Sequence, residues 1–183
     1  EKIALKRADL TLEQRVLVGL MLRCGMANNE VAGLRLREID LPNKRINING
    51  VVDLGMPTKE RNSFMAAYKK YPKTESRFRS LPVPDDLYVY LEEYCKTISD
   101  FLFLTRDGAL LTESSFHARW QAIINQWNKA AGGKGHMDPE KRKLVVDHWA
   151  IGQDLSPYFL RHEYATELMK VGYSLPEAMY LMG

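Results

Sequence analysis

Apolar residues recur at helical spacing in several separate stretches of the chain. The first such face consists of Val16, Leu17, Leu20, Met21 and Cys24. The preceding segment Thr11-Leu12-Glu13-Gln14 has the form of a capping box, in which a threonine begins a helix and a glutamine reaches back to its backbone. Gly25 follows and is typical of a helix end. The pattern predicts a helix over about 12–24 with this face in a core.

The same pattern predicts five more helices. They are expected over about 28–36, 85–95, 112–131 and 156–172, and from a second capping box at 174–177 onward. The longest of them carries an apolar face of Phe116, Trp120, Ile123, Ile124 and Trp127. Because these residues keep helical spacing, the aromatic rings are assigned to a core rather than to base stacking. Helices therefore dominate the predicted structure.

Strand patterns are fewer and cluster in the middle of the chain. Ile46 and Ile48 alternate with polar residues, and two more strands are expected over 68–73 and 78–83. The last two are joined at 74–76, so the three should pair as a small antiparallel sheet. The expected fold class is α+β: mainly α with one three-stranded antiparallel sheet.

Two segments have no clear period. Residues 53–66 contain Gly55 and Pro57 and are expected to form a loop. Residues 134–151 fit either a loop with one helical turn or a short strand. Neither segment alters the predicted fold class.

Composition is that of one ordinary soluble domain. The chain has 183 residues, 45% of them apolar, which is enough for a continuous core. Cys24 and Cys95 have no metal-type spacing and fit buried thiols in a reducing compartment. The apolar run over 16–22 is too short to span a membrane. A cytoplasmic protein is expected, cut from something longer because Glu1 is not a natural first residue.

Charge is distributed unevenly. The net charge is only +3, but residues 59–79 hold seven basic and two acidic side chains. Such a stretch attracts phosphate through its local field, or it is a solvated face on a long loop. Charge alone leaves both readings open.

Near the chain's end, an arginine is placed where a helix begins. The segment Ser156-Pro157-Tyr158-Phe159-Leu160-Arg161-His162 puts Arg161 one turn after Tyr158, with Ser156 expected as the cap and Pro157 at the first helical position. A guanidinium offers a rigid set of donors that matches phosphate, and a helix N-terminus adds unpaired amides. The segment resembles the box Thr/Ser-Pro-His-x-Leu-Arg-His of the tyrosine recombinases, the lambda-type integrases.

Two further segments resemble this family, in the family's order. Residues 22–34 are similar to the box Thr-Gly-Leu/Met-Arg-x-x-Glu-x-x-x-Leu, and residues 72–83 to the hairpin Lys-Thr-x-x-Ser-x-Arg-x-Ile/Leu-Pro-Leu. The ending Tyr180-Leu181-Met182-Gly183 is similar to the Leu-Leu-Gly that precedes a final histidine. The resemblance implies that residues 1–183 are a recombinase catalytic domain, without the N-terminal core-binding domain of the family.

The family's chemistry implies a role for several residues. A tyrosine attacks a DNA phosphodiester, a 3′-phosphotyrosyl bond holds the strand, and another strand then attacks, which serves integration or other site-specific recombination. Arg161 would bind the phosphate, Lys73 would protonate the leaving oxygen, and Tyr158 would donate a hydrogen bond in place of the usual histidine. Glu30 would orient a neighbouring cation and His162 would support Arg161.

The resemblance also implies partners. Arg77 and Arg79 are expected to contact the DNA backbone or to be solvated. Double-stranded DNA is the expected partner, with self-association as a tetramer on DNA. No metal, no other cofactor and no membrane is expected.

Two departures from the family pattern bear on activity. Ala27 stands where the family has its first catalytic arginine, and loss of such a donor costs about 2.7–4 kcal/mol of transition-state stabilisation. This alanine, natural or introduced, is expected to leave Glu30 without its partner. The nucleophilic tyrosine is expected beyond Gly183, because Tyr173 and Tyr180 do not occupy its position. The chain is therefore expected to be an inactive fragment of a recombinase.

Two alternatives remain. One is a recombinase-fold protein that binds DNA without catalysing, which Ala27 favours and which Lys73, Arg161 and Glu30 argue against. The other is a helical scaffold whose basic patches are incidental, with Arg161 in a structural ion pair and the strand cations discouraging sheet pairing. DNA binding separates the scaffold from the other two.

Overall fold

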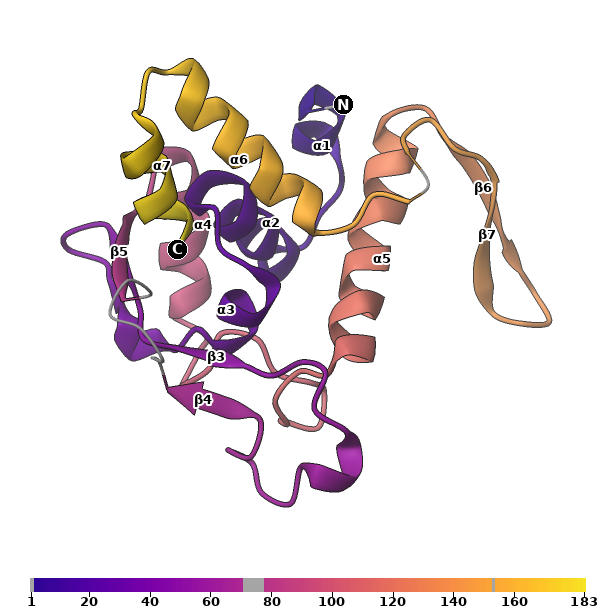
Figure 1. Cartoon of the computed structure of the whole chain (residues 1–183). Coiled ribbons are helices and arrows are strands. Elements are labelled where there is room, and N and C mark those ends of the chain that lie inside the picture. Colours follow the sequence, from indigo (N-terminus) through magenta and orange to yellow (C-terminus); the bar gives the residue numbers. More distant parts are fainter. Residues whose placement is uncertain (1, 71–77, 153) are drawn as a thin grey trace.

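The computed structural model describes residues 2–70, 78–152 and 154–183, and in this part of the chain helices enclose a core with small sheets at its edge (Figure 1). The helices are α1 (Lys2–Arg7), α2 (Leu12–Cys24), α3 (Asn28–Gly33), α4 (Asp85–Cys95), α5 (Glu113–Ala130), α6 (Tyr158–Lys170) and α7 (Leu175–Met182). The strands are β1 (Ile39–Asp40), β2 (Arg45–Ile48), β3 (Gly50–Val52), β4 (Tyr68–Lys70), β5 (Arg79–Pro82), β6 (Lys134–Asp138) and β7 (Lys143–His148). The α+β fold class expected from the sequence is confirmed.

Helix α2 is the centre of the core, packed between α4 and α6. Its start is the predicted capping box: the Thr11 hydroxyl accepts from the Gln14 amide at 3.3 Å, and the Gln14 side chain accepts from the Thr11 amide at 3.0 Å. Gly19 faces α4, where a Cβ would lie 2.3 Å from a Leu87 methyl, so glycine sets the close approach of these helices. The predicted apolar face of α2 is buried.

Helix α5 also follows its prediction. Thr112 caps it, and its apolar face is buried, as predicted from helical spacing. The Trp120 indole N–H donates to the Leu155 carbonyl at 2.6 Å, which satisfies the polar end of a buried ring. The rings of α5 therefore belong to the core and are not base-stacking platforms.

The sheets differ from the prediction in their membership. The three-stranded antiparallel sheet has the order β1-β2-β5, while β4 pairs with β3 in a separate two-stranded sheet. The prediction that Tyr68 and its neighbours join the sheet of Ile46 is therefore wrong. Strand β3 extends the apolar run after β2 and lies directly on α3, where a Cβ at Gly33 would be 2.7 Å from the Val51 Cα. That close contact turns β3, and with it β4, away from β2.

A hairpin accounts for the segment that the sequence left open. β6 and β7 pair antiparallel and project from the body beside α5 (Figure 1). Most of their side chains are exposed, and a hollow of ≈ 990 Å³ lies between α5 and β7, lined among others by Trp120, Val146 and Trp149. Strands with so little burial carry a weak apolar alternation, which explains why residues 134–151 show no clear periodicity.

The observed ends of two helices differ slightly from the predicted ends. α3 ends at Gly33 instead of continuing to Leu36, and a 3₁₀ turn follows over Leu36–Glu38. α6 begins at Tyr158 with Pro157 as its N-cap, so the expected side-chain cap by Ser156 is absent. α1 was not predicted. None of the described helices has the length and apolar character needed to cross a membrane.

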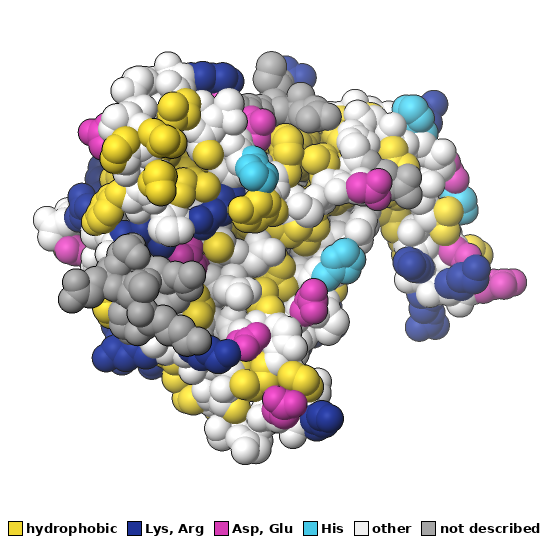
Figure 2. Space-filling view, viewed as in Figure 1, with side chains coloured by type: hydrophobic (Ala, Val, Ile, Leu, Met, Phe, Trp, Pro, Cys, Tyr) yellow, Lys and Arg dark blue, Asp and Glu magenta, His cyan; other side chains and the backbone are white. Residues whose placement is uncertain are grey.

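Surface character varies over the fold. Figure 2 shows apolar side chains gathered over α7 and the end of α6, while the hairpin carries mixed charges. Exposed apolar residues in the first region are Met169, Val171, Tyr173, Leu175, Met179 and Tyr180.

Both predicted thiols, Cys24 and Cys95, are buried and form no disulfide. Burial raises the pKa of Cys24 to about 12, so this thiol stays protonated and unreactive.

Glu38 provides a test of the packing around β4. Its carboxylate accepts from the Arg35 amide at 3.0 Å, and burial raises its pKa above the ordinary value of 4.5. A raised carboxyl pKa adds stability below pH 4.5, and this contribution is lost as pH rises through the raised value. We therefore expect Glu38→Gln to increase the free energy of unfolding at pH 7 and to leave it nearly unchanged at pH 4.

Urea unfolding at the two pH values measures this difference. The exposed Glu60→Gln is the control for loss of one carboxylate. A Glu38→Gln variant that is less stable than the original chain at pH 7 would contradict the assignment.

Candidate functional site

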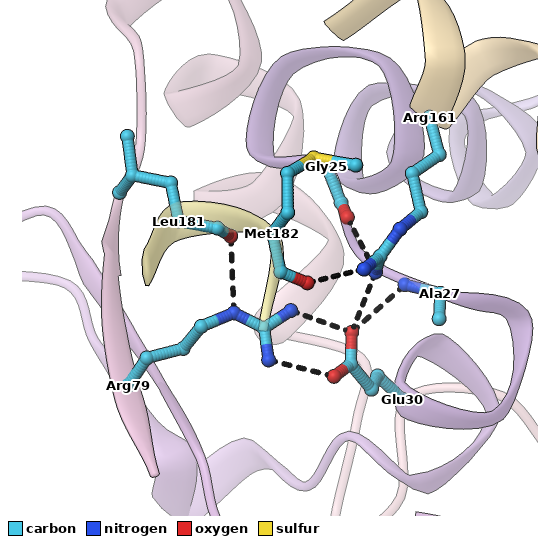
Figure 3. Close-up of polar contacts among 7 residues, drawn as sticks. All are labelled: Gly25, Ala27, Glu30, Arg79, Arg161, Leu181 and Met182. Carbon is cyan, nitrogen blue, oxygen red and sulfur yellow. Dashed lines mark hydrogen bonds and ion pairs between the residues drawn. The ribbon is translucent and has the colours of Figure 1, made fainter. Parts of the chain in front are cut away.

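Three segments far apart in sequence meet at the carboxylate of Glu30 (Figure 3). Glu30 comes from α3, Arg79 from β5 and Arg161 from α6. All three side chains are nearly or fully buried, with exposures of 7%, 0% and 11%. A buried cluster of three charges needs good geometry to be stable, because each ion loses its hydration.

The Arg79 guanidinium binds Glu30 with both ends of its fork. One terminal nitrogen donates to Glu30 Oε1 and the other to Oε2, each at 2.8 Å. The Ala27 amide donates to Oε2 as well, also at 2.8 Å, which forms half of a capping box at the start of α3. Arg161 reaches the same oxygen from the other side at 3.5 Å. Glu30 is thus held mainly by Arg79 and the backbone, and more weakly by Arg161.

Arg161 is held by backbone carbonyls in addition to Glu30. It donates to the Gly25 carbonyl at 2.9 Å and to the Met182 carbonyl at the end of α7. Gly25 ends α2 with a φ of 66°, and a Cβ there would lie 2.2 Å from the Tyr164 ring. Glycine therefore lets α6 approach the end of α2 closely enough for Arg161 to reach this carbonyl.

Both guanidiniums also contact the end of α7. Arg79 Nε donates to the Leu181 carbonyl at 3.0 Å, next to the carbonyl bound by Arg161. The last carbonyls of a helix have no partner within it and carry partial negative charge, so cations are favoured there. Through these bonds, β5 and α6 fix the position of the C-terminal turn of α7.

Two tyrosines of α6, Tyr164 and Tyr158, lie in the helix that carries Arg161. Burial raises the pKa of Tyr164 to about 12, so its hydroxyl stays protonated beside α2. Tyr158 is exposed at the first position of α6, and its ring meets the His162 ring edge-on, with centroids 4.4 Å apart.

No group of three or more His, Cys, Asp and Glu residues that could hold a metal ion occurs in the described parts of the chain.

The structure brings together four of the residues singled out from the sequence: Ala27, Glu30, Arg79 and Arg161. Glu30, Arg161 and the Ala27 backbone are in direct contact, as the resemblance between their segments implies. Lys73 and Arg77 lie outside the described residues, so their roles stay predictions.

Two expectations are corrected. Glu30 was expected to lack a partner because position 27 is alanine, but Arg79 binds both of its oxygens. Arg79 was expected to be solvated or to lie on the DNA backbone, but its side chain has no exposed surface. The burial follows from strand alternation, because Arg79 shares the inward face of β5 with the buried Leu81. The same alternation was the sequence signal that could have placed Arg79 inside.

His162 has a different neighbour from the one expected. Its ring is exposed and contacts Tyr158, whereas Arg161 points inward to Glu30. Consecutive helical residues point about 100° apart, so the two side chains diverge. A supporting role of His162 toward Arg161 stays a prediction.

The basic stretch over 59–79 separates into members with different surroundings. Arg61 donates to five backbone carbonyls of the loop and of the segment before α5: Asp53, Leu54, Met56, Leu110 and Leu111. Lys69 pairs with Asp53 at 2.6 Å. Arg61 and Arg79 thus stabilise the fold from within, while Lys59 and Lys70 are exposed.

The geometry around Glu30 supplies a fixed positive charge and little else. Guanidiniums do not lose their protons in proteins, so the site cannot act as an acid or base through Arg79 or Arg161. A guanidinium held in a preorganised position is suited to an anion, above all a phosphate. Anion binding is the chemistry that these residues can provide.

Comparison with solved structures gives the fold. The Tn1549 transposon integrase in complex with circular intermediate DNA aligns with a TM-score of 0.72 at 19% identity, covering 99% of this chain and 56% of that one. The crystal structure of XerA recombinase aligns with a TM-score of 0.63 at 16% identity, covering 99% of this chain and 51% of that one. Both share the arrangement of helices and small sheets described above.

Comparison with the sequences of known proteins agrees with the structural comparison. The chain is 23% identical to the transposase from transposon Tn916 of Enterococcus faecalis, over 99% of this chain and 42% of the relative. It is 25% identical to the tyrosine recombinase XerD of Pseudomonas aeruginosa, over 95% of this chain and 46% of the relative. The chain therefore spans less than half the length of these proteins. The profile of the phage integrase family matches residues 3–183, and the chain belongs to that family.

Proposed function

We propose that this chain is the catalytic domain of a site-specific tyrosine recombinase and binds duplex DNA through its phosphates. One observation carries the proposal: the first and last of the three resembling segments converge, with Glu30 and Arg161 in contact beside Ala27. The second segment contributes through Arg79. Chains that merely share scattered motifs have no reason to bring them to one buried cluster.

In the proposed reaction, a tyrosine hydroxyl attacks the phosphorus of a DNA strand, and its proton passes to solvent water. The bond to the 5′ oxygen breaks, and Lys73 donates a proton to that oxygen. Arg161 binds the non-bridging oxygens, whose charge grows in the transition state, and Tyr158 offers a hydrogen bond from its exposed position. We assign the nucleophile to no tyrosine of residues 1–183, so cleavage is proposed for a full-length recombinase.

The partner included in the proposal is DNA. The aligned Tn1549 integrase was solved in complex with DNA, which supports duplex DNA as the ligand of the same fold. Self-association on DNA stays a prediction. The second candidate function is a DNA-binding protein of this fold without catalysis, and the observation that favours it is the methyl group at Ala27.

We expect the affinity of the chain for duplex DNA to fall steeply as salt rises, because phosphate contacts release counterions. Fluorescence anisotropy with a labelled duplex at 50–200 mM salt gives the slope of log affinity against log salt. Arg161→Met should reduce this slope by about one, the contribution of a single phosphate contact. Arg161→Lys should keep the slope and lower the affinity, since it retains charge and loses the fork.

Arg106→Met, at an exposed turn away from the Glu30 cluster, is the control. Circular dichroism at the assay temperature establishes that each variant is folded. An affinity that does not change with salt would rule out phosphate binding as the basis of the interaction.

Ala27→Arg in the full-length recombinase distinguishes an enzyme from a binder. Ala27 is half-buried and has an ordinary extended backbone, with φ −78° and ψ 158°, so a longer side chain fits without backbone strain. We expect the rate of covalent adduct formation on a suicide DNA substrate to rise about 100- to 1000-fold. Formation of no adduct by Ala27→Arg, with DNA binding intact, would favour the non-catalytic function.

A further inference from the structure

We propose that Gln121 and Asn125 of α5 read base edges of duplex DNA, with adenine as the preferred base, and so contribute to the choice of DNA sequence. The inference rests on the proposed function, since it takes duplex DNA as the ligand of this face. It assigns a role to the hollow between α5 and β7, which lies outside the Glu30 cluster.

This hollow adjoins the start of α6. It has a volume of ≈ 990 Å³ and lies between α5, strand β7 of the projecting hairpin and the segment that leads into α6 (Figure 1). Ser156 and Pro157 belong to its lining, and the next residue in the chain is the exposed Tyr158. Because Tyr158 directly follows this lining, a duplex that contacts Tyr158 also reaches the hollow.

One wall of the hollow is a polar stripe on a helix whose other face is in the core. His117, Gln121 and Asn125 are four residues apart along α5, so they share one face, and all three line the hollow. His117 is exposed, and the two amide side chains are half-buried. The stripe rises about 12 Å along the helix axis, which matches about three to four base pairs at about 3.4 Å each.

The two amides of the stripe orient each other and keep hydrogen-bonding groups for a ligand. Gln121 Nε2 donates to Asn125 Oδ1 at 3.2 Å, and neither side chain makes another hydrogen bond within the described residues. The pair thus keeps the Gln121 carbonyl oxygen as an acceptor and the Asn125 amide hydrogens as donors. Adenine presents one acceptor and one donor in the major groove, and Gln and Asn side chains are its usual partners.

The charges around the hollow favour bases over phosphates. In the described part of the chain, the charged side chains that line it are Lys143 on β7 and Asp154 before α6, and their formal charges cancel. A surface that follows a DNA backbone needs an excess of cations, which these residues do not provide. Uncharged donors and acceptors suit base edges, which carry the sequence information that phosphates lack.

Selection from a randomised duplex library tests the inference on this chain. We expect the original chain to enrich A·T pairs at neighbouring positions, and Gln121→Ala to lose that preference. The affinity of this variant for the selected duplex should fall about 10- to 100-fold, which is the discrimination that a bidentate base contact gives. The slope of log affinity against log salt should stay unchanged, because no phosphate contact is removed.

Gln126→Ala is the matched control. Gln126 is also a half-buried glutamine of α5, but it lines a separate hollow together with Lys129 and Met137, so its loss should leave the base preference unchanged. Gln121→Arg should change the preference from adenine to guanine, since arginine pairs with guanine O6 and N7. A role in folding alone predicts no such switch. Alanine and arginine are good helix formers, and circular dichroism verifies that each variant is folded.

The outcomes separate this inference from the proposed function. A base preference that Gln121→Ala leaves unchanged, or that Gln126→Ala removes equally, overturns the inference. An original chain that binds duplex DNA in a salt-dependent manner but without sequence preference overturns it as well, and phosphate binding stands. If Gln121→Arg switches the preference but Ala27→Arg in the full-length recombinase forms no covalent adduct, catalysis is refuted and base reading stands. Binding to no duplex at all refutes both.

Discussion

The buried carboxylate of Glu30 is the constraint on which the site depends. A lone negative charge in this interior would be prohibitively costly, so every element around it supplies a donor: the backbone of α3, the fork of Arg79 on β5 and the guanidinium of Arg161 on α6. Satisfying one acidic group thereby fixes the relative positions of three segments. The same bonds extend through Arg79 and Arg161 to the end of α7.

The contacts of Glu30 change the interpretation of Ala27. The alanine at position 27 does not leave an unbalanced charge, because Glu30 is already paired and the Ala27 amide is one of its donors. The fold therefore tolerates alanine here without a structural penalty. Under the proposed function, alanine at this position lacks only a second cation toward the phosphate, so we expect its effect on chemistry and not on architecture.

Much of the helical architecture follows from local signals. The capping boxes at Thr11 and Ser174 and the apolar face of α5 are fixed by residues close in sequence, and the structure confirms them. Sheet membership depends on the contact between α3 and β3, and the hairpin has little buried surface, so neither leaves a strong pattern. Glu30 and Arg161 could be placed at the site from their segments. The partner of Glu30 could not, because a pairing between β5 and α3 is not encoded near either residue.

Gly25 affects the geometry of the site because it has no side chain. Its left-handed backbone and the 2.2 Å that would separate a Cβ from the Tyr164 ring leave no room for any other residue. The spacing between α2 and α6, and with it the reach of Arg161 to the Gly25 carbonyl, is therefore set by a residue without a side chain. Any side chain at position 25 would push α6 away from the end of α2 and so withdraw Arg161 from the Gly25 carbonyl.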